Sequence, residues 1–407
     1  MATTSGAQLS DRNLLLVMCA AEVFGMLGIT TFSALLPTMQ AEWTLSYADA
    51  GWITGIYFAG YALSVPVLVS LTDRVDPLRI YLFSTALGAA SLLGFALIAD
   101  GFWSALIFRT FSGVALAGTY MPGLKALTDR IEGPGQPRAV AFYTSSFGIG
   151  TALSFLVAGE VAALWSWQWA FGAAALGAPV SMVLAGWALT VRRGTAHPAP
   201  ETHLLDFRPV LRNREAMGYI LAYAAHNWEL FGLRGWIVAF LVFSQTLQPG
   251  YGGWNVTLIA TLVALIAVPS SIIGGEIAMR FPRRRYVSTI MTLSALLAAL
   301  YGFTAGLPFP LVAALAMVYG MFVTADSAAI TTGAVQAAPK GGRGAVMAVH
   351  SGLGFVGAFI GPLAFGVVLD IAGADHLIGW GLAFASLGVA VFMGPVALAL
   401  LARRVKT

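Results

Sequence analysis

Charged side chains are scarce in this sequence. Asp, Glu, Lys and Arg make up only 10% of its 407 residues, and 58% are hydrophobic. An ordinary soluble domain has about 25% charged residues. Forty charged side chains (22 basic and 18 acidic) are too few to cover a soluble protein of this size. The composition excludes a cytosolic enzyme, a DNA-binding protein and a disordered chain, and leaves an all-α polytopic membrane protein embedded in the lipid bilayer.

Cysteine and metal-binding motifs are equally sparse. Cys19 is the only cysteine and lies in the first apolar run, which excludes a disulfide framework and a thiolate metal site. The sequence has no nucleotide-binding P-loop, no H-E-x-x-H motif and no cluster with metal-ligand spacing. We therefore expect no cofactor, no metal and no enzymatic activity, and no cleavable signal peptide is apparent.

Long apolar runs predict twelve transmembrane helices, since a membrane helix needs roughly 20 apolar residues. The connections are mostly short, except for the polar, proline-containing stretch 192–215. This stretch divides the chain into two six-helix bundles, 1–191 and 216–407. The predicted spans are 14–37, 50–70, 79–99, 103–124, 139–161, 168–191, 216–244, 255–279, 286–305, 310–334, 345–370 and 378–402.

The basic residues predict the orientation of these spans. If the spans alternate, 20 of the 22 Lys and Arg residues fall on one side of the membrane. The positive-inside rule then places both termini and the central loop in the cytoplasm, as expected for a protein of the inner membrane. The pI near 9.3 therefore reports topology and not a nucleic-acid partner.

The two halves of the sequence resemble each other at a nearly constant offset. Gly51-Trp52 corresponds to Gly253-Trp254 at an offset of 202, and Arg138 corresponds to Arg343 at 205. A parallel duplication of a six-span unit is typical of transporters with a substrate site between the halves, near the middle of the membrane.

The connection after the second span carries a motif. It reads Val69-Ser-Leu71-Thr-Asp73-Arg74-Val-Asp76. Its second copy reads Gly275-Glu-Ile-Ala-Met-Arg280-Phe-Pro-Arg283-Arg284, which keeps the glycine and the basic residues but lacks the aspartate. Leu71, Asp73 and Arg74 match the loop signature G-x-L-x-D-R-x-G-R-R of the major facilitator superfamily, whereas Val69 and Asp76 replace its glycines.

Two further features carry the same resemblance. Arg109-x-x-x-Gly113 is similar to that family's fourth-span motif, while the Gly-Pro pair of its fifth-span antiporter signature is absent. The chain resembles this family over essentially its whole length. The resemblance implies two pseudo-symmetric six-helix bundles, a central cavity lined by spans 1, 4, 7 and 10, and a cytoplasmic gate formed by Asp73, Arg74 and Arg280.

Few ionisable residues lie inside the predicted spans, where a charge costs about 2.5–3.5 kcal/mol and is functional by default. Span 7 is the richest. We predict that it binds substrate through His226, Trp228, Glu229 and Arg234, with a local break at Gly232 or Gly235 letting Glu229 and Arg234 pair. The alternative is a salt bridge that only locks the spans together. Arg109 is the better anion candidate, because guanidinium stays protonated and binds carboxylate bidentately; the alternative is a buried pair with an acid or with backbone carbonyls.

Three other residues are candidates for carrying protons. Glu22 has no basic residue in reach along its own helix, so it could bind a proton or be a neutral structural acid. Asp326 and His350 lie toward the cytoplasmic ends of adjacent spans and are expected to pair, either as a proton relay or as a static hydrogen bond.

These residues predict a secondary active transporter that works by alternating access as a monomer. It is expected to move a small organic anion or metabolite together with protons. Proton-driven efflux of amphipathic drugs, a uniporter or exchanger, and a transporter-like sensor are the alternatives.

Overall fold

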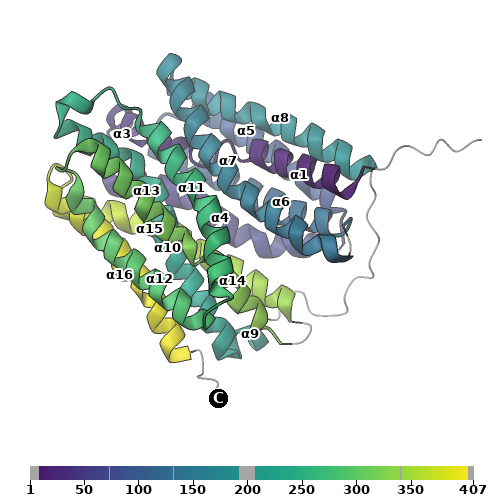
Figure 1. Cartoon of the computed structure of the whole chain (residues 1–407). Helices are drawn as coiled ribbons and strands as arrows, with labels where there is room; N and C mark the ends of the chain where they lie inside the picture. The colour runs from purple at the N-terminus through teal and green to yellow at the C-terminus, as the bar shows by residue number, and fades with distance from the viewer. Residues whose placement is uncertain (1–8, 73, 132, 192–206, 340–341, 402–407) are drawn as a thin grey trace, which may run out of the picture.

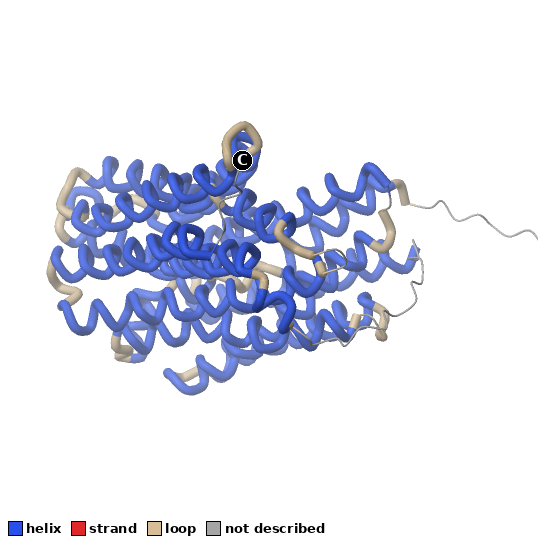
Figure 2. Tube along the Cα trace, turned by 90° about the horizontal axis from the view of Figure 1, so that it is seen from below, coloured by secondary structure: helices blue, strands red, loops and turns tan. Residues whose placement is uncertain are grey.

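The computed structural model describes residues 9–72, 74–131, 133–191, 207–339 and 342–401. Across these residues the secondary structure is helical, and no strand occurs in the part described (Figure 2). The side chains of Ser46 and Asp49 form a capping box at the start of α4, and Asp76 caps α5 directly before Pro77. Such caps satisfy the free N–H groups of a first helical turn and fix where each helix begins.

The described residues of the first half of the chain form eight α-helices. They are α1 (Asp11–Gly25), α2 (Thr31–Ala34), α3 (Leu36–Trp43), α4 (Tyr47–Leu71), α5 (Pro77–Ile98), α6 (Phe102–Thr128), α7 (Gln136–Leu164) and α8 (Trp167–Val191). The first predicted span is thus divided into α1, α2 and α3, with a non-helical stretch over residues 26–30.

The second half of the chain forms another eight. They are α9 (Arg208–Arg212), α10 (Arg214–Thr246), α11 (Val256–Ala278), α12 (Arg283–Tyr301), α13 (Phe309–Ala325), α14 (Ser327–Gln336), α15 (Arg343–Ala372) and α16 (Leu377–Leu401). The tenth predicted span is divided at Asp326, between α13 and α14.

Among the described residues, nine helices are long and apolar enough to cross a membrane. The other three predicted spans are the divided first span, α6 and α10. These three contain the buried charges Glu22, Arg109, Glu229 and Arg234. The first span falls short in length, because α1 has only 15 residues. α6 and α10 are 27 and 33 residues long and fall short in hydropathy.

The helix starts define the register of the internal repeat. From α4 to α11 the start moves by 209 residues (47 to 256), and from α8 to α16 by 210 (167 to 377). Gly51 lies inside α4, five residues after its N-cap Ser46, whereas Gly253 precedes Asn255, the N-cap of α11. The predicted pairing of Gly51-Trp52 with Gly253-Trp254 is therefore wrong by several residues.

The helices form two bundles that pack against each other through α4 with α15 and α7 with α11. Glycine permits the closest contacts: a Cβ at Gly55 would lie 2.4 Å from the carbonyl oxygen of Phe359. The described N-terminus, the last described residues of α8 and α16, and the start of α10 lie at one end of the molecule (Figure 1). We call this the terminal end, and the opposite end the distal end.

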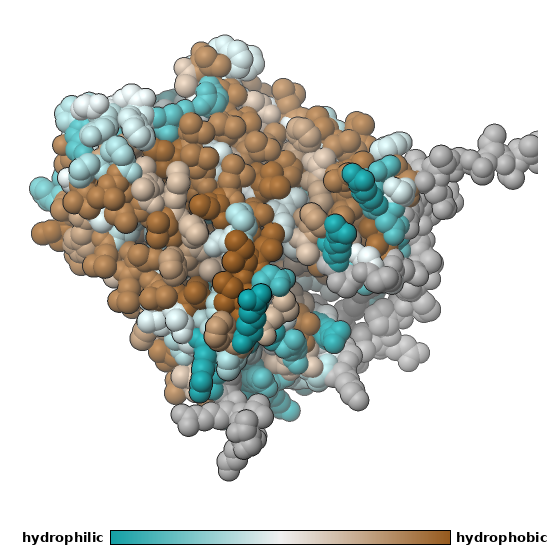
Figure 3. Space-filling view, in the orientation of Figure 1, coloured by the Kyte–Doolittle hydropathy of each residue, from teal (hydrophilic) through white to brown (hydrophobic). Residues whose placement is uncertain are grey.

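Apolar side chains cover most of the surface in Figure 3, and hydrophilic residues gather toward its ends. Leu97 and Ile371, for example, are 80% and 81% exposed. Such a surface is suited to a lipid environment, because soluble monomers rarely expose large apolar patches.

Candidate functional site

Seven predicted site residues are buried in the interior. Their side chains are each at most 8% exposed, and they come from both bundles. They are Glu22 in α1, Arg109 in α6, His226, Glu229 and Arg234 in α10, Asp326 at the junction of α13 and α14, and His350 in α15.

Arg109 is bound to the backbone of the divided first span. Its Nη1 donates to the carbonyl oxygen of Gly28 at 3.1 Å, and its Nη2 donates to that of Ile29 at 3.2 Å. The guanidinium also lies 4.4 Å from the ring centroid of Tyr57. Gly28 and Ile29 lie in the non-helical stretch 26–30, and Arg109 supplies donors to their two carbonyls. The structure therefore gives Arg109 the backbone-carbonyl partners that were the alternative to an anion.

Two residues of α7, Ser154 and Thr151, also bind the non-helical stretch 26–30. Neither was predicted from the sequence. Ser154 Oγ donates to the carbonyl of Leu27 at 2.7 Å and accepts from the Thr30 amide at 3.0 Å. The Thr30 hydroxyl donates to the carbonyl of Thr151 at 3.2 Å. A lone hydroxyl in an apolar span carries little sequence signal, because Ser and Thr often bond within their own helix.

Arg234 has a different environment. Its side chain is 8% exposed, and among the described residues it has no hydrogen-bond or ion-pair partner. Its guanidinium carbon lies 5.6 Å from the ring centroid of Phe231. It borders a cavity of about 10 Å³ that is also lined by Phe155 of α7 and Thr324 of α13. This space holds at most one water molecule, so in this conformation the cavity beside Arg234 has no room for a larger ligand.

The expected pair of Glu229 with Arg234 is wrong. α10 runs unbroken from Arg214 to Thr246, so no local break turns the two side chains together. Glu229 Oε1 instead accepts hydrogen bonds from Ser294 Oγ at 2.8 Å and Tyr319 OH at 3.1 Å. Its second oxygen, Oε2, has no partner. Glu229 is therefore a buried carboxyl inside the C-terminal bundle, with half of its hydrogen-bonding capacity unused.

The expected pair of Asp326 with His350 is also wrong, because Asp326 contacts His226. The His226 Nδ1 and Asp326 Oδ1 atoms lie 2.9 Å apart, within ion-pair distance, although they are not aligned as a hydrogen bond. The His350 ring stacks on Tyr223 at 3.8 Å, and the Tyr223 ring also stacks with His226 at 5.8 Å. Tyr223 was not among the predicted site residues, and its ring joins the two histidines.

Glu22 lies in the N-terminal bundle, away from this group. Its Oε2 accepts a hydrogen bond from Ser146 Oγ, and its Oε1 has no partner. The hydroxyl of buried Tyr143 is likewise without a partner. Each bundle thus contains a buried carboxyl with a free oxygen.

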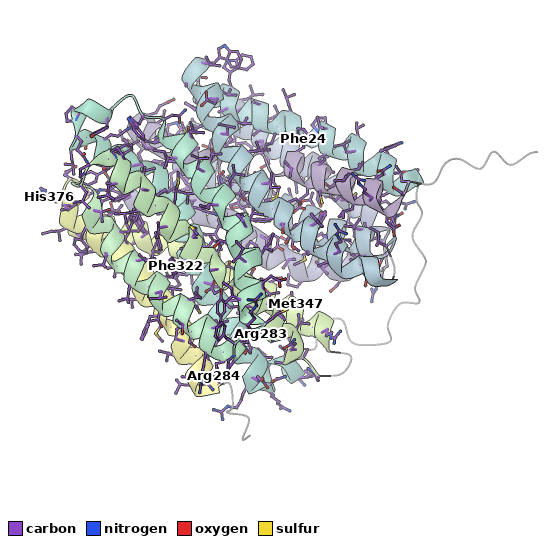
Figure 4. All side chains as sticks on the ribbon, viewed as in Figure 1. Phe24, Arg283, Arg284, Phe322, Met347 and His376 are labelled. Atoms are coloured by element: carbon purple, nitrogen blue, oxygen red, sulfur yellow. The ribbon has the colours of Figure 1, made fainter. Side chains whose placement is uncertain are left out.

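The remaining predicted residues are the gate residues Asp73, Arg74 and Arg280, and Trp228 in the middle of α10. Arg74 and Arg280 are exposed near the terminal ends of α4 and α11, and Asp73 lies outside the described residues. Trp228 is half-buried, and its Nε1 has no partner. Figure 4 places Arg283 and Arg284 toward the terminal end and His376 at the distal end. Within the described ranges, no group of three His, Cys, Asp or Glu residues is placed to hold a metal ion.

Curated relatives match parts of the chain. YbcL, an MFS-type transporter of Bacillus subtilis, is 26% identical over 60% of this chain. The multidrug export protein EmrB of Haemophilus influenzae is 26% identical over 43%, and the niacin transporter NiaP of Acinetobacter baylyi 28% identical over 39%. The chain spans 59%, 34% and 36% of the lengths of these relatives.

A solved structure and a family profile match nearly the whole chain. A bacterial homologue of the human lysosomal transporter Spinster, in an inward-facing and occupied conformation, superposes with a TM-score of 0.78. It is 17% identical and covers 98% of both chains. The profile of the Major Facilitator Superfamily matches residues 18–253 and 243–407. This multi-pass membrane protein therefore belongs to the Major Facilitator Superfamily of transporters.

Proposed function

We propose that this transporter carries a small organic anion across the inner membrane together with protons. The observation that carries the proposal is Arg234, a buried guanidinium with no hydrogen-bond or ion-pair partner among the described residues. A charge in the interior of a membrane protein is costly unless it is paired. A substrate carboxylate would supply that partner, since guanidinium binds carboxylate through two parallel hydrogen bonds.

The same proposal assigns proton carriers. Glu229, with one free oxygen, and the His226–Asp326 contact lie in the C-terminal bundle, as does Arg234. Glu22 is the corresponding acid of the N-terminal bundle, and His350 joins His226 through Tyr223. Carboxyl and imidazole groups in low-dielectric surroundings change protonation when a nearby charge arrives or leaves. Binding of an anion at Arg234 would thus favour protonation of these groups.

The distribution of basic residues supports an orientation of the protein in the membrane. Arg283 and Arg284 are at the terminal end, and 20 of the 22 basic residues of the sequence fall on one side of the predicted spans. The positive-inside rule supports a cytoplasmic location for the terminal end, where Asp73, Arg74 and Arg280 would form the gate. We propose that the protein acts as a monomer.

The proposal is tested by uptake into proteoliposomes under an imposed pH gradient, with radiolabelled nicotinate as the first probe and other small carboxylates after it. We expect an inward proton gradient to drive carboxylate accumulation. Glu229→Gln keeps an acceptor for Ser294 and Tyr319 but does not titrate, so we expect uptake that no longer responds to the gradient. Gradient-independent uptake by the wild type would contradict proton coupling and favour a uniporter or exchanger.

Drug efflux is the second candidate, favoured by the relative named as a multidrug export protein. In that case the free carboxyls of Glu22 and Glu229 would bind cationic drugs. Overexpression would then confer resistance to several amphipathic cations, and Glu22→Gln would abolish it. Under the anion proposal, overexpression leaves resistance unchanged.

A further inference from the structure

The distal ends of the two bundles are joined by hydrogen bonds at helix N-termini. The Asp370 carboxylate, near the end of α15, accepts from the Tyr47 amide at 3.0 Å through Oδ1 and from the Ala48 amide at 2.8 Å through Oδ2. These are the first two amides of α4, which have no partner within the helix. The third residue of the turn, Asp49, donates its amide to Ser46 Oγ. The first turn of α4 is therefore capped partly from the other bundle.

A second bond joins the bundles between α7 and α11. Glu160, near the end of α7, accepts from Asn255 Nδ2 through Oε1 at 2.7 Å. Asn255 is the N-cap of α11, and its Oδ1 accepts from the Leu258 amide at 2.9 Å. Because a carboxylate accepts only, Glu160 fixes the amide of Asn255 in the orientation that caps α11.

The two bonds are equivalent under the internal repeat. Glu160 and Asp370 are 210 residues apart, and the N-caps that precede the bonded turns, Ser46 and Asn255, are 209 apart. These offsets are close to the shifts between the starts of α4 and α11 (209 residues, 47 to 256) and of α7 and α15 (207 residues, 136 to 343). In each case an acid near the end of one helix reaches the N-terminus of a helix in the other bundle. The repeat relates α4 to α11 and α7 to α15, so it relates the two contacts to each other.

We propose that Asp370 and Glu160 are a pair of symmetry-related positioning residues that hold the distal end of the transporter closed. An acid at a helix N-terminus is stabilised by the free amides and by the helix dipole. When the bundles separate at this end, both carboxylates lose these donors to water. The pair thus favours the conformation closed at the distal end, and its loss shifts the population toward the conformation open there.

Asp370 is expected to stabilise the conformation closed at the distal end more than Glu160 does. It binds two backbone amides directly, with both oxygens, whereas Glu160 acts through one side-chain amide. Both acids are exposed to solvent, which weakens each contact. We expect Asp370→Ala to raise the ratio of open to closed molecules about fivefold, the size of a typical N-cap effect. Glu160→Ala should raise it about twofold, and the double variant more than either.

The experiment measures distances between spin labels at the distal end. Labels are placed at Gln168→Cys in the N-terminal bundle and His376→Cys in the C-terminal bundle, both exposed positions, in a Cys19→Ser background. We expect a longer distance to gain population in the order Glu160→Ala, Asp370→Ala, double variant. Asp100→Ala is the matched control, because Asp100 is a distal acid that bonds to Ser104 within its own bundle.

An unchanged distance distribution in the double variant would overturn the proposal, as would an equal change in the Asp100→Ala control. If the alanine variants do not fold, Asp370→Asn and Glu160→Gln remove the charge at constant size and should change the same distances in the same order. The inference rests on the two-bundle transporter fold and not on the substrate, so it stands or falls separately from the anion proposal.

Discussion

The two arginines buried in the bundles differ in what surrounds them. Arg109 in the N-terminal bundle is 1% exposed and donates to two backbone carbonyls. Arg234 in the C-terminal bundle is 8% exposed and, within the described residues, has neither a hydrogen-bond nor an ion-pair partner. From the sequence both are candidate anion anchors, with Arg109 the better one. The comparison shows that burial of a charge does not by itself indicate a binding site, because the partner decides what the charge does.

The helices explain the difference. Arg109 faces residues 26–30, where the first span is not helical and carbonyl groups are free to accept. Arg234 lies on α10, which is continuous, and it borders helices whose backbone groups are already paired. A continuous helix offers a neighbouring cation few backbone acceptors. Arg109 is therefore built into the fold, whereas Arg234 is without such backbone partners among the described residues, which is why we propose it as the anion site.

The largest expected effect is that of Arg109→Met on stability. It removes two charged hydrogen bonds and leaves the carbonyls of Gly28 and Ile29 unpaired, so we expect a loss of about 3 kcal/mol in the free energy of unfolding. Thermal or denaturant unfolding of the purified protein measures it. Arg285→Met, at an exposed arginine, is the control and should leave stability unchanged. Equal stability of both variants would mean that Arg109 does not stabilise the non-helical stretch 26–30.

Ser154→Ala is expected to have a smaller effect of the same sign. It removes the acceptor of the Thr30 amide and the donor to Leu27. We expect a loss of about 1 kcal/mol. Ser145→Ala on the same helix is the matched control, because Ser145 bonds to the carbonyl of Ala141 within α7. An equal loss of unfolding free energy in both variants would show that the effect does not come from the bonds of Ser154 to the non-helical stretch 26–30.

Arg234→Met is expected to change stability least, and in the opposite direction. Replacing an unpaired buried charge with an apolar side chain of similar length is neutral or stabilising, by up to about 1 kcal/mol. Unfolding in the absence of any ligand measures this. A loss comparable to that of Arg109→Met would show that Arg234 has a structural partner, and the contrast between the two arginines would disappear.

Much of the fold was predictable because its signals are local. Apolar runs located the spans, and residues such as Ser46 and Asp76 have the side chains that cap α4 and α5. The three less apolar spans (the first span, α6 and α10) were recognised as well, because the basic clusters alternate between connections as expected for twelve spans, and this alternation does not depend on hydropathy. The repeat was found, but its register was misjudged at Gly51 because Gly-Trp occurs both inside α4 and before α11.

The contact partners of the site residues were not predictable, because they depend on where helices are interrupted and on how each helix is rotated about its axis. No motif marks residues 26–30 as non-helical, so the bonds of Arg109 could be considered only as an alternative. Asp326 could face His226 or His350 on neighbouring helices, and only their packing selects His226. Asp370 and Glu160 were not considered at all, since exposed acids near helix ends are common.

The central claim is that Arg234 is free to bind a carboxylate. It is tested most directly by the thermal shift of the purified transporter with matched pairs of ligands, such as nicotinate with nicotinamide and benzoate with benzamide. A ligand that binds the folded state raises the melting temperature by mass action. We expect carboxylates to raise the melting temperature of the wild type, the amides to leave it unchanged, and Arg234→Gln to abolish the difference. Equal shifts for carboxylate and amide, or a carboxylate shift that survives in Arg234→Gln, would contradict it.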